Sequence, residues 1–214
     1  MYVEERPAVG VRPVAAGPQT PRKWSVMGVP LTGGDGVPLP GSAPPALSVG
    51  FGWTPPEESR ADFDVDAAAL MLDDAGAVLS EDHFVHFNNP RSPDGSVEHR
   101  GPAPDGPGET IDVDLAAVPD RCARIAFPVS IFDAANRAQR LGQVRAVSVR
   151  VTRRPGGPEL ARYDLPARRD DDPATAVLIG ALDRGAEGWT FRAVGRGYPG
   201  GLREIAHDHG LPVR

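Results

Sequence analysis

Three aspartates stand at alternate positions in the segment 62–66, and the apolar run Ala67–Leu72 follows them directly. In an extended strand, side chains at alternate positions point to the same face. We therefore expect Asp62, Asp64 and Asp66 to project together from one end of a buried strand. Like charges this close repel one another, and a hard divalent cation relieves that repulsion. The segment predicts a cation site, and a solvated strand end that runs into a turn remains the alternative.

Further oxygen ligands occur later in the chain. Asn88 and Asn89 follow the expected strand 84–87, and Asp105 and Glu109 lie in a loop rich in glycine and proline. Calcium takes about six to eight oxygen ligands from carboxylates, amides and backbone carbonyls. Loops at one end of a β-sandwich can supply them from separate parts of the chain. The candidate calcium ligands are Asp64, Asp66, Asn88, Asn89, Asp105 and Glu109.

The sequence lacks the residue patterns required for zinc binding, disulfide formation, nucleophilic catalysis or phosphate binding. His83 and His86 are three positions apart, so in a strand they face opposite sides and cannot share one zinc ion. The single cysteine, Cys122, excludes an internal disulfide and a cysteine-based zinc site, and its apolar surroundings predict a buried thiol. The chain contains neither a Gly-x-Ser-x-Gly elbow nor a phosphate-binding loop. We therefore expect no catalytic activity.

Composition narrows the class of protein. The chain has 214 residues, of which 40% are hydrophobic and 24% charged, and its net charge is -6. This balance is typical of a soluble globular protein, and an acidic chain is a poor partner for nucleic acid. The sequence contains no apolar run of about 18 residues and no signal-peptide pattern. We expect a cytoplasmic protein.

The elements that must position these residues are short strands. Apolar residues alternate with polar ones in several segments, among them 46–53, 109–115 and 144–152, and clusters of Gly and Pro separate them. A turn at 155–157 predicts a hairpin. Two segments have helical character: 133–140, which Asp133 would cap, and 200–210, which Gly210 would close. The pattern predicts an all-β, two-sheet β-sandwich with one or two short helices, including a C-terminal one.

The expected organisation is an arm followed by one domain. Residues 1–22 show no helical or strand periodicity, so we expect a flexible N-terminal arm there and the folded domain over 23–214. The expected core includes Trp53, Phe127, Ile131, Val149, Trp189 and Phe191.

Seven segments, in order along the chain, resemble the TerD family of tellurium-resistance and stress-response proteins. They are Gly50–Trp53, Phe63–Ala67, Phe87–Ser96, Val129–Ala134, Gly142–Arg145, Glu159–Leu165 and Trp189–Leu202. The resemblance implies a cytoplasmic, calcium-binding β-sandwich without established catalytic activity. It also implies Asp64 and Asp66 as calcium ligands, with Asn88 or Asn89 beside them.

The chain departs from the family pattern in the loop 101–109. The family has a Gly-Asp-Asn opening and an acidic run there, whereas this loop is shorter and retains only Asp105 and Glu109. Because fewer charged ligands give less electrostatic stabilisation of a bound ion, we expect at most one well-held calcium ion.

Two functions remain open. The first is a calcium-binding stress-response module, acting as an adaptor for protein partners in an assembly that is cytoplasmic or associated with a membrane surface. The second is a structural or interaction protein of a multiprotein assembly in which calcium binding is weakened or lost.

Overall fold

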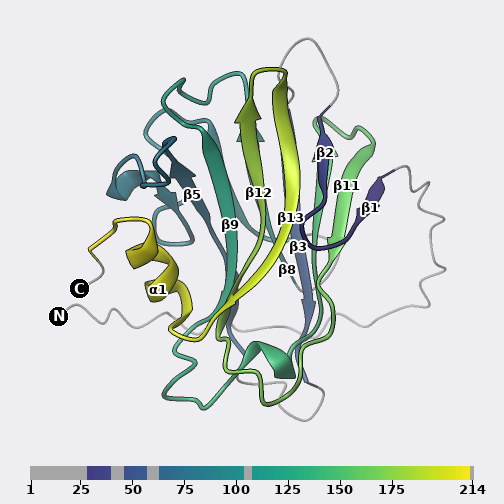
Figure 1. The fold of residues 1–214 in the computed structure, drawn as a ribbon, viewed down its shortest axis with the longest axis vertical. Helices are drawn as coiled ribbons and strands as arrows, with labels where there is room; N and C mark the ends of the chain where they lie inside the picture. Colours follow the sequence, from purple (N-terminus) through teal and green to yellow (C-terminus); the bar gives the residue numbers. More distant parts are fainter. Residues whose placement is uncertain (1–27, 40–45, 57–62, 104–107, 213–214) are drawn as a thin grey trace, which may run out of the picture.

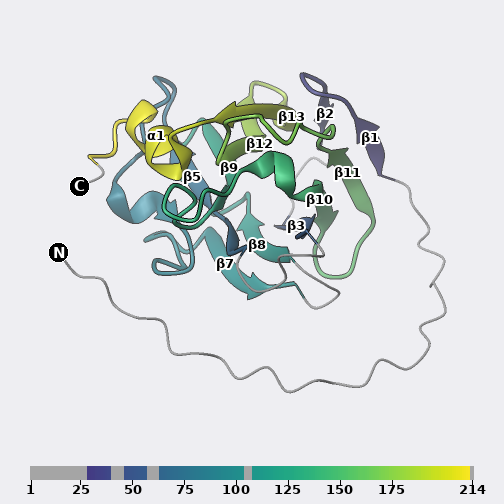
Figure 2. The ribbon, with the colours of Figure 1, turned by 90° about the horizontal axis from the view of Figure 1, so that it is seen from below.

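The described part of the chain forms two β-sheets packed face to face. A computed structural model describes residues 28–39, 46–56, 63–103 and 108–212. Figure 1 shows the two layers of strands with a helix beside them, and Figure 2 shows the same layers from below. The all-β, two-sheet prediction is therefore confirmed, as is the short C-terminal helix α1 (Gly201–Asp208). The arm predicted for residues 1–22 lies outside the described residues.

The two sheets are called sheet A and sheet B. Sheet A contains, in spatial order, β1 (Val29–Leu31), β11 (Glu159–Asp164), β10 (Arg145–Arg153), β3 (Ala46–Thr54), β8 (Gly108–Asp114) and β7 (Val97–Pro102). Sheet B contains β2 (Gly36–Pro38), β13 (Gly188–Tyr198), β12 (Ala176–Gly185), β9 (Arg124–Ile131), β5 (Ala69–Leu72) and β6 (Phe84–Val85), and β4 (Val65–Ala67) also pairs with β9. Two short 3-10 helices, η2 (Glu81–His83) and η3 (Leu141–Gln143), lie in the connections.

The core lies between the sheets because alternate residues of each strand point inward. Phe51 of β3 and Phe127 of β9 meet across the interface, with ring centroids 5.8 Å apart. All six residues predicted for the core are buried. Removing a large apolar side chain of this kind from water contributes about 1.5–3 kcal/mol. The sequence thus predicts correctly which of these strand residues face the core.

A smaller apolar cluster lies on the outer face of sheet B, where α1 covers it (Figure 2). Ile205 of α1 packs there with Leu70 and Leu72 of β5 and with Ala126 of β9. Residues 69–72 are consequently buried on both faces of their strand. This explains why the apolar run after the aspartates does not alternate.

The acidic segment forms a shorter and more broken strand than the sequence predicts. β4 begins only at Val65, so Asp64 precedes the strand, and Ala68 separates β4 from β5. The Ala68 N–H donates to the Pro128 carbonyl, which keeps the chain beside β9 across the break. Of the predicted row of aspartates, only Asp66 lies in the strand, and Asp62 is outside the described residues.

The helix predicted for residues 133–140 is wrong. The segment forms turns, because Asp133 and Ala138 have φ angles of 53° and 51°, which a right-handed helix does not allow. The Asp133 carboxylate accepts a hydrogen bond from the Asn136 side chain at 2.6 Å instead of capping a helix. The one helical turn in this region is η3, which follows the segment.

The turn predicted at 155–157 is confirmed, since it joins β10 and β11 as an antiparallel hairpin. A second turn, at 32–36, joins two short strands that belong to different sheets: β1 pairs with β11 of sheet A, and β2 pairs with β13 of sheet B. This turn therefore connects the two layers.

Among the described residues, no helix is long and apolar enough to cross a lipid bilayer.

Candidate functional site

Asp66 and Glu109 both line a cavity of about 390 Å³ at one end of the sandwich, which we call the Glu109 cavity. Asp66 comes from β4 of sheet B and Glu109 from β8 of sheet A, so the cavity lies where the two sheets approach each other. Phe87, Pro90 and His99 contribute to its walls. Two of the six candidate ligands, distant in sequence, are thus brought to one place.

Hydrogen bonds fix the Glu109 carboxylate. Its Oε2 accepts from the Ala67 N–H at 2.6 Å and lies 3.1 Å from His99 Nε2. Since His99 Nδ1 accepts from the Gly101 N–H at 3.2 Å, the neutral ring carries its proton on Nε2 and donates it to Glu109. One side chain of sheet A is therefore bonded to the backbone of sheet B, next to Asp66.

Arg100 also lines the Glu109 cavity, but its charge is engaged elsewhere. Its guanidinium bonds Asp112 at 2.7 Å and Glu98 at 2.8 Å. Both carboxylates lie on the outer face of sheet A, where β7 and β8 pair. The guanidinium therefore does not neutralise the carboxylates of the cavity.

The other candidate ligands lie apart from this cavity. Asn89 donates its side-chain amide to the Phe84 carbonyl at 2.8 Å, and this holds the turn that ends β6. The Asn88 N–H donates to His86 Nδ1 at 3.3 Å. Asp64 accepts a hydrogen bond from the Phe132 N–H through its backbone carbonyl. None of these three candidates is among the residues that line the Glu109 cavity.

Asp105 lies outside the described residues, yet the ends of its loop are placed. Pro102 of β7 pairs with Glu109 of β8, and the Ala103 N–H donates to the Gly108 carbonyl at 2.8 Å. The loop that contains Asp105 therefore starts and ends beside the cavity.

The donor set fits calcium in part. A carboxylate has about four lone-pair sites, and two donors occupy Glu109 Oε2, so Glu109 retains capacity to bind a cation beside Asp66. Both groups are hard oxygen donors of the kind that calcium prefers. Within the described residues, however, no three His, Cys, Asp or Glu side chains cluster closely enough to hold a metal ion.

A second and larger cavity, of about 630 Å³, lies on the outer face of sheet B. We call it the Ser130 cavity, after the serine of β9 on its floor. The sequence does not predict this cavity, although one signal is present: Ser130 is the one hydroxyl-bearing residue of β9, between Val129 and Ile131. Asp66 lines both cavities, so they are neighbours.

His86 lines the Ser130 cavity and forms part of an aromatic wall. Its ring centroid lies 4.7 Å from that of Phe84 and 5.7 Å from that of Phe87. Burial, together with the nearby His99, lowers the pKa of the His86 imidazole. At neutral pH this wall is therefore uncharged.

A chain of hydrogen bonds also links Ser80, His83 and Asp94. Ser80 Oγ lies 2.6 Å from His83 Nδ1, and His83 Nε2 lies 3.3 Å from an Asp94 carboxylate oxygen. Although burial alone would raise the pKa of Asp94, hydrogen bonds from Ser96 and Ser92 hold it below its usual value. The three residue types are those of a hydrolase triad, but none of them lines either cavity. These hydrogen bonds link the η2 segment to the turn that contains Asp94.

Comparison with known proteins decides the family. A sequence model of the TerD domain matches residues 27–209. The chain belongs to the TerD family. It is 39% identical over 191 residues to the tellurium resistance protein TerD of Serratia marcescens, covering 86% of this chain and 98% of that protein. It is 40% identical over 177 residues to general stress protein 16U of Bacillus subtilis, covering 79% of this chain and 91% of that protein.

Solved structures give the same fold. The crystal structure of a TerD homologue from Streptomyces coelicolor superimposes with a TM-score of 0.60 at 22% identity, covering 78% of this chain and 99% of that one. At this identity the likeness supports the sandwich alone. The TerD relatives at higher identity carry the link to tellurium resistance and stress response.

Proposed function

We propose that this TerD-family protein is a calcium-binding module of a stress response and acts as a non-catalytic adaptor. The observation that supports the proposal is that Asp66 and Glu109 line one cavity where the two sheets approach each other. Both carboxylates would bind the ion, and Asp105, whose loop begins and ends there, would add a third. Main-chain carbonyl oxygens would complete the set of ligands.

The physical role of the ion is to link the sheets. Asp66 belongs to sheet B and Glu109 to sheet A, so a cation between them replaces repulsion by attraction across the sandwich. An ion that binds only the folded state stabilises it by RT ln(1 + [L]/Kd), which is about 2.7 kcal/mol at a hundredfold excess over Kd. With few charged ligands, we propose at most one well-held ion.

The relatives support a stress-response role, and the adaptor role is our proposal within it. Their names place them in tellurium resistance and general stress. We propose that the protein works in the cytoplasm, binds protein partners in a stress-response assembly and associates peripherally with a membrane surface. Nucleic acid is not among the proposed ligands, because the chain carries a net charge of -6.

The test is a set of melting curves with calcium and with chelator. Calcium should raise the melting temperature of the wild type, and Asp66→Asn combined with Glu109→Gln should abolish the shift. Asp164→Asn is the control, because Asp164 pairs with Arg162 on the outer face of sheet A. The single variants Asp64→Asn, Asn88→Ala and Asn89→Ala decide whether these three candidates also bind the ion.

The second candidate function is an interaction protein that has weakened or lost calcium binding. It is favoured by the scarcity of clustered donors in the described ranges and by the two hydrogen bonds already made to Glu109. If the wild type melts at the same temperature in calcium and in chelator, the calcium proposal fails and this second function replaces it.

A further inference from the structure

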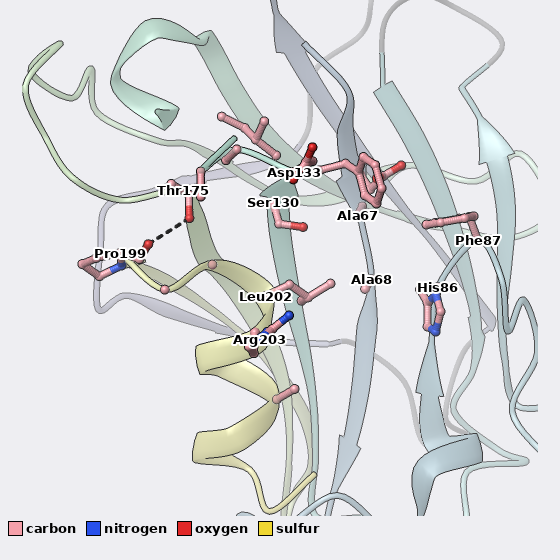
Figure 3. Close-up of a pocket in the computed structure, with 18 of the residues that line it drawn as sticks. Ala67, Ala68, His86, Phe87, Ser130, Asp133, Thr175, Pro199, Leu202 and Arg203 are labelled. Atoms are coloured by element: carbon pink, nitrogen blue, oxygen red, sulfur yellow. Dashed lines mark hydrogen bonds between the residues drawn. The ribbon is translucent and has the colours of Figure 1, made fainter. Parts of the chain in front are cut away.

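The Ser130 cavity has the dimensions of a small-molecule site. It lies between α1, the end of β9 and the turn after β6 (Figure 3). Its volume of about 630 Å³ falls within the range of roughly 300–1,000 Å³ that is usual for ligand pockets. The floor is the outer face of sheet B, where Ser130 of β9 and Ala68 line the cavity.

The Ser130 hydroxyl points to a ligand. Ser130 is 6% exposed, and its side chain on β9 lines the cavity together with Leu202 and Ala68 (Figure 3). Among the described residues its hydroxyl has no hydrogen-bond partner. The hydroxyl faces the cavity, where water can reach it, so it is a polar group available to a bound molecule. A polar group of such a molecule would take the place of that water as its hydrogen-bond partner.

The walls are mainly apolar and could hold a ring. Phe84, His86 and Phe87 form the aromatic wall described above, and Leu202 of α1 lies opposite across the cavity (Figure 3). Phe132 is 48% exposed and also lines the cavity. Burial of such a side chain against a ligand would contribute free energy in proportion to the apolar area covered.

The charges favour a cation. Asp66 and Asp133 supply two carboxylates, and Arg203 of α1 supplies the one guanidinium among the lining residues. Asp66 is the register partner of Ser130 in the β4–β9 pair, so the two side chains leave sheet B on the same face from neighbouring positions. An ammonium group placed there would reach a carboxylate and a hydroxyl oxygen together.

We propose that the Ser130 cavity binds a small organic amine, with the ammonium group at Asp66, Asp133 and Ser130 and an apolar body against the aromatic wall. The inference does not require the calcium proposal to hold, because it uses the outer face of sheet B and is tested in the presence of chelator. It adds a ligand site to the proposed stress-response module.

Three matched probes test the chemistry: 2-phenylethylamine, 2-phenylethanol and phenylacetate. Binding to the full-length protein in EDTA is measured by NMR titration of backbone amides. The amine should bind at the cavity, the alcohol at least about tenfold more weakly, and the carboxylate not at all. Equal affinities for the amine and alcohol, or tighter binding of phenylacetate, would overturn the proposal.

Substitutions of residues that line the Ser130 cavity test whether the amine binds there. Ser130→Ala and Asp133→Asn should each weaken binding of 2-phenylethylamine about fivefold or more, and Ala68→Leu should block it by filling the cavity. Ser148→Ala is the control, because Ser148 is a comparably buried serine on the outer face of sheet A. Melting curves confirm folding, and the two polar variants suffice if Ala68→Leu does not fold. Wild-type affinity in both polar variants would refute the assignment.

Discussion

Cys122 is the one cysteine of the chain, and its side chain is completely buried. Its Sγ–H donates to the Arg124 carbonyl at 3.3 Å, and burial raises the pKa of the thiol to about 11. Since the thiolate is the reactive species, we expect native Cys122 to react with a disulfide reagent at pH 8 at least about a hundredfold more slowly than in the denatured protein. Timed labelling with and without denaturant measures this. Rapid labelling of the native protein would contradict it.

Some residues of the two cavities can be predicted from the sequence, and others cannot. Asp66 and Glu109 can be identified because carboxylates next to apolar alternation are visible in the sequence. His99 cannot, since its contact with Glu109 depends on which side of β7 faces the core, and that strand is irregular between His99 and Gly101. Ser130 stands out in the sequence only as a serine inside an apolar strand, and this does not predict a cavity until the neighbours of that strand are known.

At the scale of elements, the sequence does not predict which strands pair when they are far apart in the chain. The strands themselves follow from local alternation, but the partners of β3 are β8 and β10, which lie far along the chain. The failure at 133–140 has a local cause, since two residues in the left-handed region interrupt an otherwise helix-compatible segment. Neither Asp133 nor Ala138 is a residue type that requires this conformation.

The β3–β8 pair offers a test of close packing between elements. Gly108 has a φ angle of 151°, and a methyl group there would overlap the Phe51 carbonyl oxygen. Gly108→Ala should therefore lower the free energy of unfolding by roughly 1–3 kcal/mol and weaken calcium binding at the adjacent Glu109. Urea denaturation measures the first effect, and calcium titration the second.

Gly50→Ala is the matched control in the same pair of strands. A methyl group added at Gly50 would have no atom within 4 Å, and the backbone there is not in the left-handed region. We expect the free energy of unfolding to stay unchanged or to rise by roughly 0.5–1 kcal/mol, because alanine loses less conformational entropy on folding than glycine. Equal destabilisation by the two substitutions would show that the close approach to the Phe51 carbonyl oxygen is not what requires glycine at position 108.

At the scale of the whole molecule, Asp66 connects the two proposed sites. It lines the Glu109 cavity between the sheets and the Ser130 cavity outside sheet B. A calcium ion bound at the first would neutralise the carboxylate that attracts an ammonium group at the second. The two ligands should therefore oppose each other, and thermodynamic linkage requires each to weaken the other by the same factor.

Coupling of this kind is usually worth about 1–3 kcal/mol, or roughly 5–150-fold in affinity. We expect saturating calcium to raise the Kd of 2-phenylethylamine at least about fivefold, and saturating amine to raise the Kd of calcium equally. Titrations in both orders, with sodium chloride matching the ionic strength, measure the two factors. Asp66→Asn should remove the coupling along with most of the binding of each ligand, whereas Asp133→Asn should weaken the amine and leave calcium unchanged. Independent binding of the two ligands by the wild type would mean that Asp66 does not serve both cavities.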